Sequence, residues 1–142
     1  MASTDASEAQ RDMTTELLEQ ARSLQERTVA LRREIHQHPE LGLHLPRTQK
    51  AVLDALHGLE LDIQLSQSTS GIVATLHGAK PGPAVLLRGD MDALPMPEET
   101  GLPFASAEPG CMHACGHDAH TAMLASAAHL LCQHREKISG SV

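Results

Sequence analysis

The chain has 142 residues, a length that suits one domain with a buried core. Its net charge is −7 with histidines neutral, which argues against a nucleic-acid partner or an anionic membrane, because both attract basic surfaces. One phenylalanine is the only aromatic side chain, so a site that stacks bases or sugars is not expected. An apolar fraction of 41% and a charged fraction of 20% are typical of a soluble globular protein.

The N-terminal segment, residues 1–9, is small and polar without periodicity, and we expect it to be disordered. No apolar run follows a basic start, so no signal peptide is expected, and no stretch approaches the length of a membrane span. Three cysteines are an odd number and do not form a disulfide framework. These features predict a reducing, cytoplasmic setting.

Apolar residues recur at helical spacing between about residues 10 and 36, which predicts one amphipathic helix or two. The helix must end near His38, because Pro39 biases the residue before it away from helical backbone. Residues 38–46 are expected to form a loop, with His36 and His38 at the surface. A second helix is expected from about Arg47 to His57, followed by a glycine that suits a helix C-terminus.

The pattern then changes from helical to alternating. Residues 61–66 and 71–78 are expected to be strands, residues 80–83 a turn, and residues 84–90 an interior strand that opens with four apolar residues. A proline-rich loop follows, and a last helix is expected from about Asp118 to Arg135. This order predicts an α/β domain with a mixed sheet flanked by helices.

Two groups of polar residues stand where sites are favoured in α/β domains, after the end of a buried strand. Asp90 and Asp92 follow the predicted strand 84–90 as "GDMD", and residues two apart on an extended chain point to the same side. Further along, Cys115 and His117 enclose a glycine in "HACGHD". Thiolate and imidazole together suit zinc, cobalt, nickel or manganese better than calcium or magnesium. The sequence therefore predicts a metal site that includes Cys115 and His117.

Each of these residues also has a plainer interpretation. A buried cysteine is usually a small apolar side chain, and an aspartate after glycine often only accepts backbone N–H groups. Asp118 could cap the last helix or hydrogen-bond a metal-bound histidine. His113 and His120 lie close to the predicted ligands, and their roles stay open, as does that of Asp90. The remaining cysteines, Cys111 and Cys132, are expected to be structural.

Four segments, in order and at matching spacing, resemble the M20 metallopeptidase and amidohydrolase family. They are "HQHPELG" (36–42), "LLRGDMDALP" (86–95), "EETGLPFAS" (98–106) and "MHACGHDAHTAML" (112–124). The resemblance covers about residues 31–142 and is closest to the branch of N-acyl amino acid, hippurate and auxin-conjugate amidohydrolases. It implies that residues 10–142 are the N-terminal part of a zinc-peptidase-like catalytic domain.

The resemblance also implies chemistry and site residues. It implies two divalent metal ions, with manganese, zinc, cobalt or nickel as candidates, and a small N-acyl amino acid as the substrate. Cys115 and His117 match metal ligands of this branch, and Asp92 matches the aspartate that supports the metal site. No role is implied for the "HPELG" loop. Homo-oligomers are also possible in such a family.

Members of the family are longer than this chain. In them a Glu-Glu pair after the corresponding helix supplies the general base and a metal ligand, further histidine ligands follow, and a small lid domain binds substrate. No such pair follows residue 136, and Glu98-Glu99 stands in a proline-rich loop. We therefore expect residues 1–142 alone to be an N-terminal portion without activity. The alternative is a non-catalytic remnant that binds a divalent metal weakly or binds a partner chain.

Overall fold

The computed structural model describes residues 2–142, with side chains described from residue 13 onward. The first helix, α1 (Ala2–Gln37), is one continuous helix that ends just before Pro39, as the sequence predicts. Its start differs from the prediction, because residues 2–9, expected to be disordered, are helical. They contain neither glycine nor proline, and extending an existing helix costs far less than starting one. Met1 lies outside the described residues.

The second helix, α2 (Pro46–Leu56), follows the loop at residues 38–45 and agrees with the prediction within a residue. Proline stands at its first position, where the missing N–H is not needed. Gly58 follows with a φ of 83°, a left-handed conformation that glycine adopts without strain. The buried face of α2 includes Val52 and Leu56, which pack against Ala125 in the hydrophobic core.

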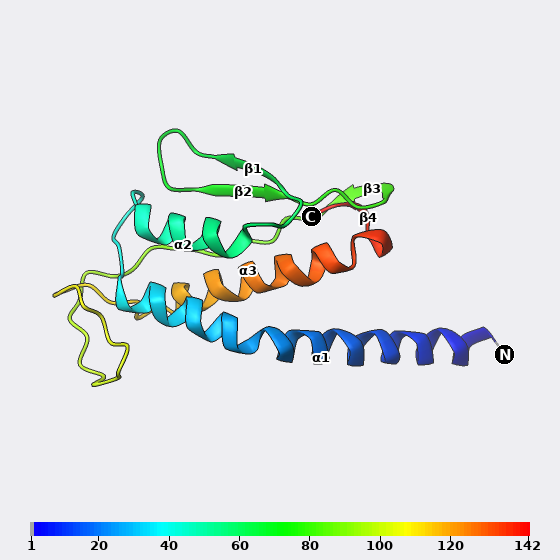
Figure 1. The fold of residues 1–142 in the computed structure, drawn as a ribbon, viewed down its shortest axis with the longest axis horizontal. Helices are drawn as coiled ribbons and strands as arrows, with labels where there is room; N and C mark the ends of the chain where they lie inside the picture. The colour runs from blue at the N-terminus through cyan, green and yellow to red at the C-terminus, as the bar shows by residue number, and fades with distance from the viewer. Residues whose placement is uncertain (1) are drawn as a thin grey trace.

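Two short strands form an antiparallel hairpin beside α2. They are β1 (Asp62–Leu65) and β2 (Ile72–Thr75), and Ile63 pairs with Ala74 in their register. Both lie within the predicted strands 61–66 and 71–78. Partly buried side chains of β2, Ile72 and Ala74, pack on the core, so the hairpin covers one side of α2 (Figure 1).

The predicted interior strand 84–90 is wrong in this structure. The strand here is β3 (Lys80–Ala84), over the residues expected to form a turn, and it pairs in parallel, with irregular register, with β4 (Ser139–Ser141). A strand needs a neighbouring backbone. Beyond Ala84, this segment pairs with the described chain through the Val85 N–H, which donates to the Ser141 carbonyl at 2.9 Å. Pairing is therefore mixed, as predicted, but it is divided between two small sheets.

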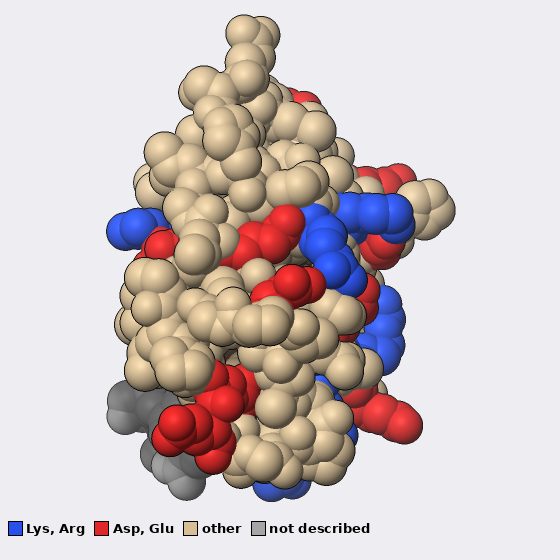
Figure 2. Space-filling view, turned by 90° about the vertical axis from the view of Figure 1, so that its left-hand side faces the viewer, with Lys and Arg blue, Asp and Glu red and all other residues tan. Residues whose placement is uncertain are grey.

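The third helix, α3 (His117–Gln133), lies between α1 and α2 and is followed by the short 3₁₀ turn η1 (Arg135–Lys137) (Figure 1). Small residues on α3, Ala122 and Ala125, are buried and allow its neighbours to approach closely. None of the described helices combines the length and apolar character needed to cross a bilayer. Acidic and basic side chains lie next to one another on the face shown in Figure 2, without a single basic patch.

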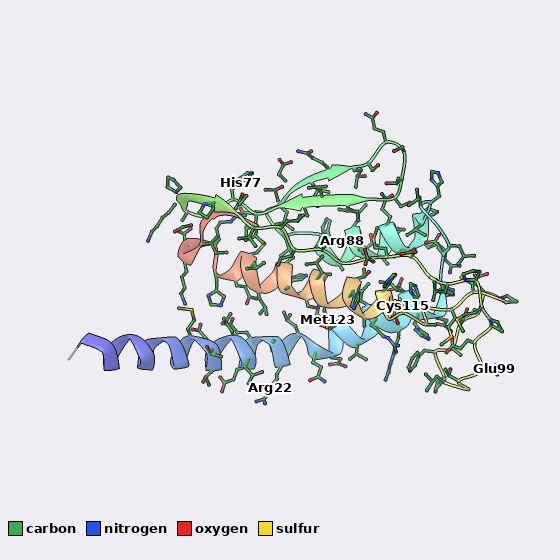
Figure 3. All side chains as sticks on the ribbon, turned by 180° about the vertical axis from the view of Figure 1, so that it is seen from behind. Arg22, His77, Arg88, Glu99, Cys115 and Met123 are labelled. Carbon is green, nitrogen blue, oxygen red and sulfur yellow. The ribbon has the colours of Figure 1, made fainter. Side chains whose placement is uncertain are left out.

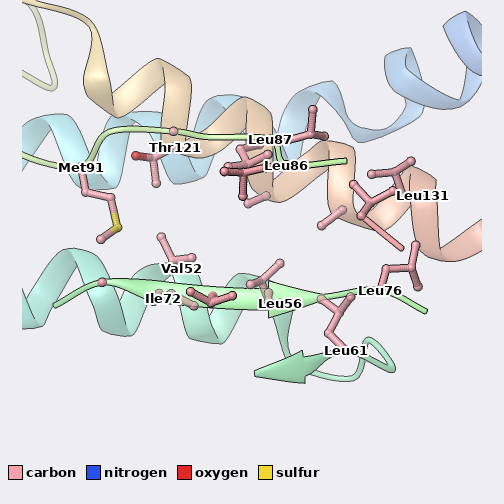
Figure 4. Close-up of a pocket in the computed structure, with 18 residues that line it drawn as sticks. Val52, Leu56, Leu61, Ile72, Leu76, Leu86, Leu87, Met91, Thr121 and Leu131 are labelled. Atoms are coloured by element: carbon pink, nitrogen blue, oxygen red, sulfur yellow. The ribbon is translucent and has the colours of Figure 1, made fainter. Parts of the chain in front are cut away.

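An apolar cavity of about 270 Å³ opens between α3, the β1–β2 hairpin and the chain at residues 86–91 (Figure 4). Leu56, Ile72 and Leu131 line it from three elements. On its outer side Leu86 is 88% exposed. The segment that the sequence assigns to a buried strand therefore leaves an apolar surface open.

Candidate metal centre

His117 stands at the first position of α3 and faces the loop that follows residue 89. Gly116 precedes it with a φ of 82°, so the chain turns sharply into the helix at a residue without a side chain. The Thr121 hydroxyl, one turn further along α3, donates to the Asp90 carbonyl at 2.8 Å. This bond joins the loop to the helix, so that Asp90 and Asp92 lie against His117.

The two aspartates approach opposite nitrogens of the His117 ring. Nδ1 donates to the backbone carbonyl of Asp92 at 2.8 Å and lies 3.0 Å from its Oδ1. Nε2 lies 3.9 Å from Oδ2 of Asp90. Because Nδ1 carries the proton for Asp92, Nε2 is left with a free lone pair. An imidazole held in this way by a carboxylate is the arrangement found around metal-binding histidines.

Donor atoms of Asp90, His117 and His120 all lie within 4.8 Å of one another. The rings of His117 and His120 are 5.7 Å apart, one helical turn from each other on the same face of α3. One carboxylate oxygen and two imidazole nitrogens are a donor set that suits a divalent ion of intermediate softness. The residues present therefore fit a divalent metal ion, and the sequence left two of them, Asp90 and His120, without a role.

Cys115 is not part of this group of donors, although it lies two residues before His117. Its thiol is free and exposed, and Figure 3 shows it close to the start of α3 (Figure 3). Cys111 is buried and Cys132 is half-buried, and burial raises the pKa of both thiols. Cys115 is thus the cysteine that a metal ion can reach, and its role as a ligand remains a prediction.

On the side of α3 away from His117 and His120 lies a cluster of charged residues, which we call the Asp118 cluster. Its members are His36, Glu98 and Asp118, whose side chains are buried, and Arg32, which is partly exposed. The Asp118 side chain is 0% exposed, and its Oδ2 accepts from Arg32 Nε at 2.6 Å and from His36 Nδ1 at 2.7 Å. The other ring nitrogen of His36, Nε2, donates to Glu98 Oε1 at 3.2 Å. The expectation that His36 lies at the surface is therefore wrong, since it is 3% exposed.

Glu98 is the most strongly perturbed carboxyl of the cluster. Burial alone would raise its pKa, but hydrogen bonds from the Thr100 hydroxyl, the Ser106 N–H and His36 outweigh burial and lower the pKa to about 2. The Ser106 N–H lies 2.6 Å from Oε2. Glu98 is therefore an ionised, fully bonded carboxylate, whereas its sequence neighbour Glu99 points out at the tip of the loop (Figure 3).

His113 lies between the cluster and the metal-facing residues. It is 3% exposed, and neither ring nitrogen has a hydrogen-bond partner among the described residues. Burial lowers its pKa more than the nearby charge of Asp118 raises it, so the neutral ring is favoured. Its ring lies 6.3 Å from that of His36.

The Asp118 cluster cannot be recognised from the sequence, because its members are far apart along the chain. A local signal did exist, since Arg32 and His36 are four residues apart and therefore share one face of α1. The same spacing is common on solvated helices, so it could not by itself reveal a buried partner. Only the fold shows that this face meets Asp118, 82 residues away.

The sequence and the structure were compared with those of known proteins, and similar proteins were found. Residues 86–142 match the model of peptidase family M20/M25/M40. Thermostable carboxypeptidase 1 of Saccharolobus solfataricus is 39% identical over 132 residues, which are 92% of this chain and 34% of the relative. N-acyl-L-amino acid amidohydrolase of Geobacillus stearothermophilus is 44% identical over 115 residues, covering 80% of this chain and 31% of the relative.

A solved structure from Bacillus subtilis, described as a dinuclear metal binding peptidase from the M20 family, superposes with a TM-score of 0.81 at 40% identity. The match covers 85% of this chain and 34% of that one. The chain thus spans about a third of the length of the relatives that it matches. The resemblance in the four sequence motifs and the predicted α/β class are confirmed by these matches.

Proposed function

We propose, on the premise that this chain belongs to the M20 family of peptidases and amidohydrolases, that it forms part of an enzyme that cleaves the amide bond of N-acyl amino acids or similar small conjugates. At the level of the family the function is metal-dependent hydrolysis. The observation that carries the proposal is the His117 imidazole, held at Nδ1 by Asp92 with Nε2 turned toward Asp90. Two relatives, an N-acyl-L-amino acid amidohydrolase and a carboxypeptidase, support the substrate class by their names.

In this proposal Cys115 and His117 hold a divalent ion, and Asp92 keeps the imidazole in the tautomer that leaves Nε2 free. When bound, the ion polarises the amide carbonyl and makes water a stronger nucleophile at neutral pH. The same proposal includes two divalent ions, of manganese, zinc, cobalt or nickel, and an assembly of several subunits. It also assigns residues 10–142 to a catalytic domain. A cytoplasmic location is part of the proposal too, and the three free thiols support it.

We also propose that the polypeptide of residues 1–142 does not turn over substrate by itself. A general base contributes about 10²–10⁴-fold to such a reaction, and the described site contains no glutamate beside the metal-facing residues. Purified polypeptide loaded with Mn²⁺, Zn²⁺ or Co²⁺ would be assayed on hippurate-like substrates against metal alone. Turnover above that control, lost in Cys115→Ala, would refute this part of the proposal.

Titration with Co²⁺ tests the ligands directly. A cobalt–thiolate bond gives a charge-transfer band, which we expect in the wild type and not in Cys115→Ser. Cys132→Ser, a change at a half-buried thiol on the distal part of α3, is the matched control and should keep the band. Affinity should fall as pH drops, because thiol and imidazole must both lose a proton to bind. A band that survives Cys115→Ser would remove Cys115 from the site.

A second candidate is a non-catalytic role in binding a metal weakly or a partner chain. The observation that favours it is the exposed apolar segment Val85–Leu87, whose side chains are 54%, 88% and 45% exposed. Exposed apolar patches of this kind commonly mark interaction surfaces. Metal binding without hydrolysis by any longer form of the protein would favour this candidate.

A further inference from the structure

Three of the sequence motifs converge on the Asp118 cluster, although the proposed function uses none of the residues that they contribute to it. His36 comes from "HQHPELG", Glu98 from "EETGLPFAS", and Asp118 from "MHACGHDAH". The same loop supplies Phe104. The Arg32 and Arg33 guanidinium groups lie over its ring, 5.1 and 4.8 Å from the centroid, and the His36 ring packs against it in a T-shaped arrangement at a centroid distance of 5.6 Å. Charged and aromatic side chains from α1, the 98–106 loop and α3 thus meet around the buried His36.

Which atoms donate hydrogen bonds in this cluster follows from the chemistry of its members. Carboxylates accept hydrogen bonds and do not donate them, so both ring nitrogens of His36 must donate, one to Asp118 and one to Glu98. Arg32 and His36 thus both donate to Asp118, and His36 also donates to Glu98. Buried charges are tolerated when they are paired and hydrogen-bonded, and the bonds to Asp118 Oδ2 and to Glu98 provide this, although Asp118 Oδ1 has no hydrogen-bond partner among the described residues.

The cluster acts on the metal-facing side through the geometry of the helix. Successive residues of an α-helix point about 100° apart, so an inward side chain at Asp118 fixes the direction of its neighbour His117. His120, one turn further, shares the outward face with His117. The N–H groups of Ala119 and His120 both donate to the Gly116 carbonyl within this first turn. The Thr121 bond to the Asp90 carbonyl holds the turn on its outward side, and the bonds of Asp118 hold it on its inward side. The orientation of the turn therefore depends in part on what holds Asp118.

We propose that the Asp118 cluster positions His117 and His120 for metal binding, with His36 as its central positioning residue. This inference rests on the proposed function for the identity of the ligand, a divalent cation. It gives a role to the His-Pro loop motif and to Glu98: they lock the rotation of the first turn of α3 from the side opposite the metal. The part of the proposal that concerns the helix itself can be measured without any metal.

The main test compares His36→Gln with Leu56→Ala. A glutamine side chain in place of His36 can bond one carboxylate but cannot bridge two, whereas Leu56 is a 4% exposed core residue of α2 outside the cluster, so its truncation destabilises the fold at another place. His57→Gln, at an exposed histidine, controls for the loss of an imidazole alone. Each protein would be titrated with Zn²⁺ and Co²⁺ alone, and its unfolding and its amide hydrogen exchange at residues 116–120 would be measured without metal.

We expect His36→Gln to lose about tenfold or more in metal affinity, the size of effect that supporting residues around metal ligands have. Exchange at residues 116–120 should accelerate more than global unfolding explains. Leu56→Ala should lose stability with metal affinity within about twofold of the wild type. Arg32→Gln, which removes one of the two donors to Asp118 at the half-exposed edge of the cluster, is a milder variant in case His36→Gln does not fold, and we expect an intermediate loss.

The outcomes separate the two proposals. Equal loss of affinity in His36→Gln and Leu56→Ala would overturn the positioning role, because affinity would then follow stability alone. Unchanged exchange at residues 116–120 in His36→Gln and Arg32→Gln would overturn it as well. If the wild type binds neither cation, the proposed metal function fails together with the metal part of this inference, and the exchange data alone decide whether the cluster orients the first turn of α3.

Discussion

Replacing Glu98 with glutamine should destabilise the protein at neutral pH and much less in acid. In the folded chain the pKa of Glu98 lies at about 2, against a usual value of 4.5. A pKa that moves by one pH unit corresponds to about 1.4 kcal/mol, so the carboxylate contributes up to about 3 kcal/mol when ionised. The side chain is 2% exposed, so solvent screens this contribution little. We expect Glu98→Gln to lower the free energy of unfolding by about 2–3 kcal/mol at pH 7.

The sign of the pH dependence follows from the direction of the shift. Because the folded-state pKa is depressed, the stabilisation is fully present above about pH 4.5 and is lost as the pH falls toward 2. Urea unfolding of wild type and Glu98→Gln at pH 7, 5, 4 and 3 should therefore show a gap that narrows below about pH 4.5. Glu99→Gln removes a carboxylate from the exposed neighbouring residue and should change stability by less than ~0.5 kcal/mol.

Equal stability of wild type and Glu98→Gln at pH 7 would refute the reasoning, because the carboxylate would then contribute nothing. So would a gap that stays constant down to pH 2.5, since a group that titrates between 2 and 4.5 cannot produce one. A loss in Glu99→Gln as large as in Glu98→Gln would show that the effect comes from the net charge of the loop and not from the buried hydrogen bonds.

Three further changes have expected outcomes. Asp92→Asn should weaken Zn²⁺ binding about 10–100-fold in calorimetric titration, because the amide no longer supports the His117 tautomer as a carboxylate does, while Asp62→Asn on the surface should not. Leu86→Lys should reduce self-association in size-exclusion chromatography with light scattering, since it places a charge on the open apolar surface, whereas Leu43→Lys, also exposed, should not. Leu76→Ala should cost about 2–4 kcal/mol in urea unfolding, because Leu76 is 2% exposed.

Local signals in the sequence were sufficient for the helices. Pro39 ends α1, and Pro46 and Gly58 bracket α2, because each restricts or frees the backbone at its own position. The interior strand at residues 84–90 could not be predicted correctly in the same way. Its apolar composition is that of a buried strand, but a strand exists only where another backbone pairs with it, and along this segment the described chain offers the Ser141 carbonyl to Val85.

In the candidate site, too, the features that depend on neighbouring residues could be predicted, and the contacts between distant residues could not. Asp92 and His117 could be selected from the sequence because each belongs to a compact motif with recognisable chemistry. Their direct contact, across a separation of 25 positions in the chain, depends on the fold. His36 was assigned to the surface because nothing near it in the sequence indicates a partner, whereas its two carboxylate partners lie 62 and 82 residues away. Periodicity alone could not have found them.

The first turns of α3 carry two groups of polar side chains that point in different directions. Asp118 points inward to the charged side chains of its cluster, while His117 and His120 point outward to a loop that carries further acidic groups. Between them Thr121 donates to the Asp90 carbonyl, and Ala122 is fully buried, so no large side chain separates α3 from its neighbours. A cation bound on the outward side, as proposed, would add positive charge less than one turn from Asp118. Because Arg32 and His36 already donate to that carboxylate, we expect Asp118 to stay in place and the outward imidazoles to keep their direction.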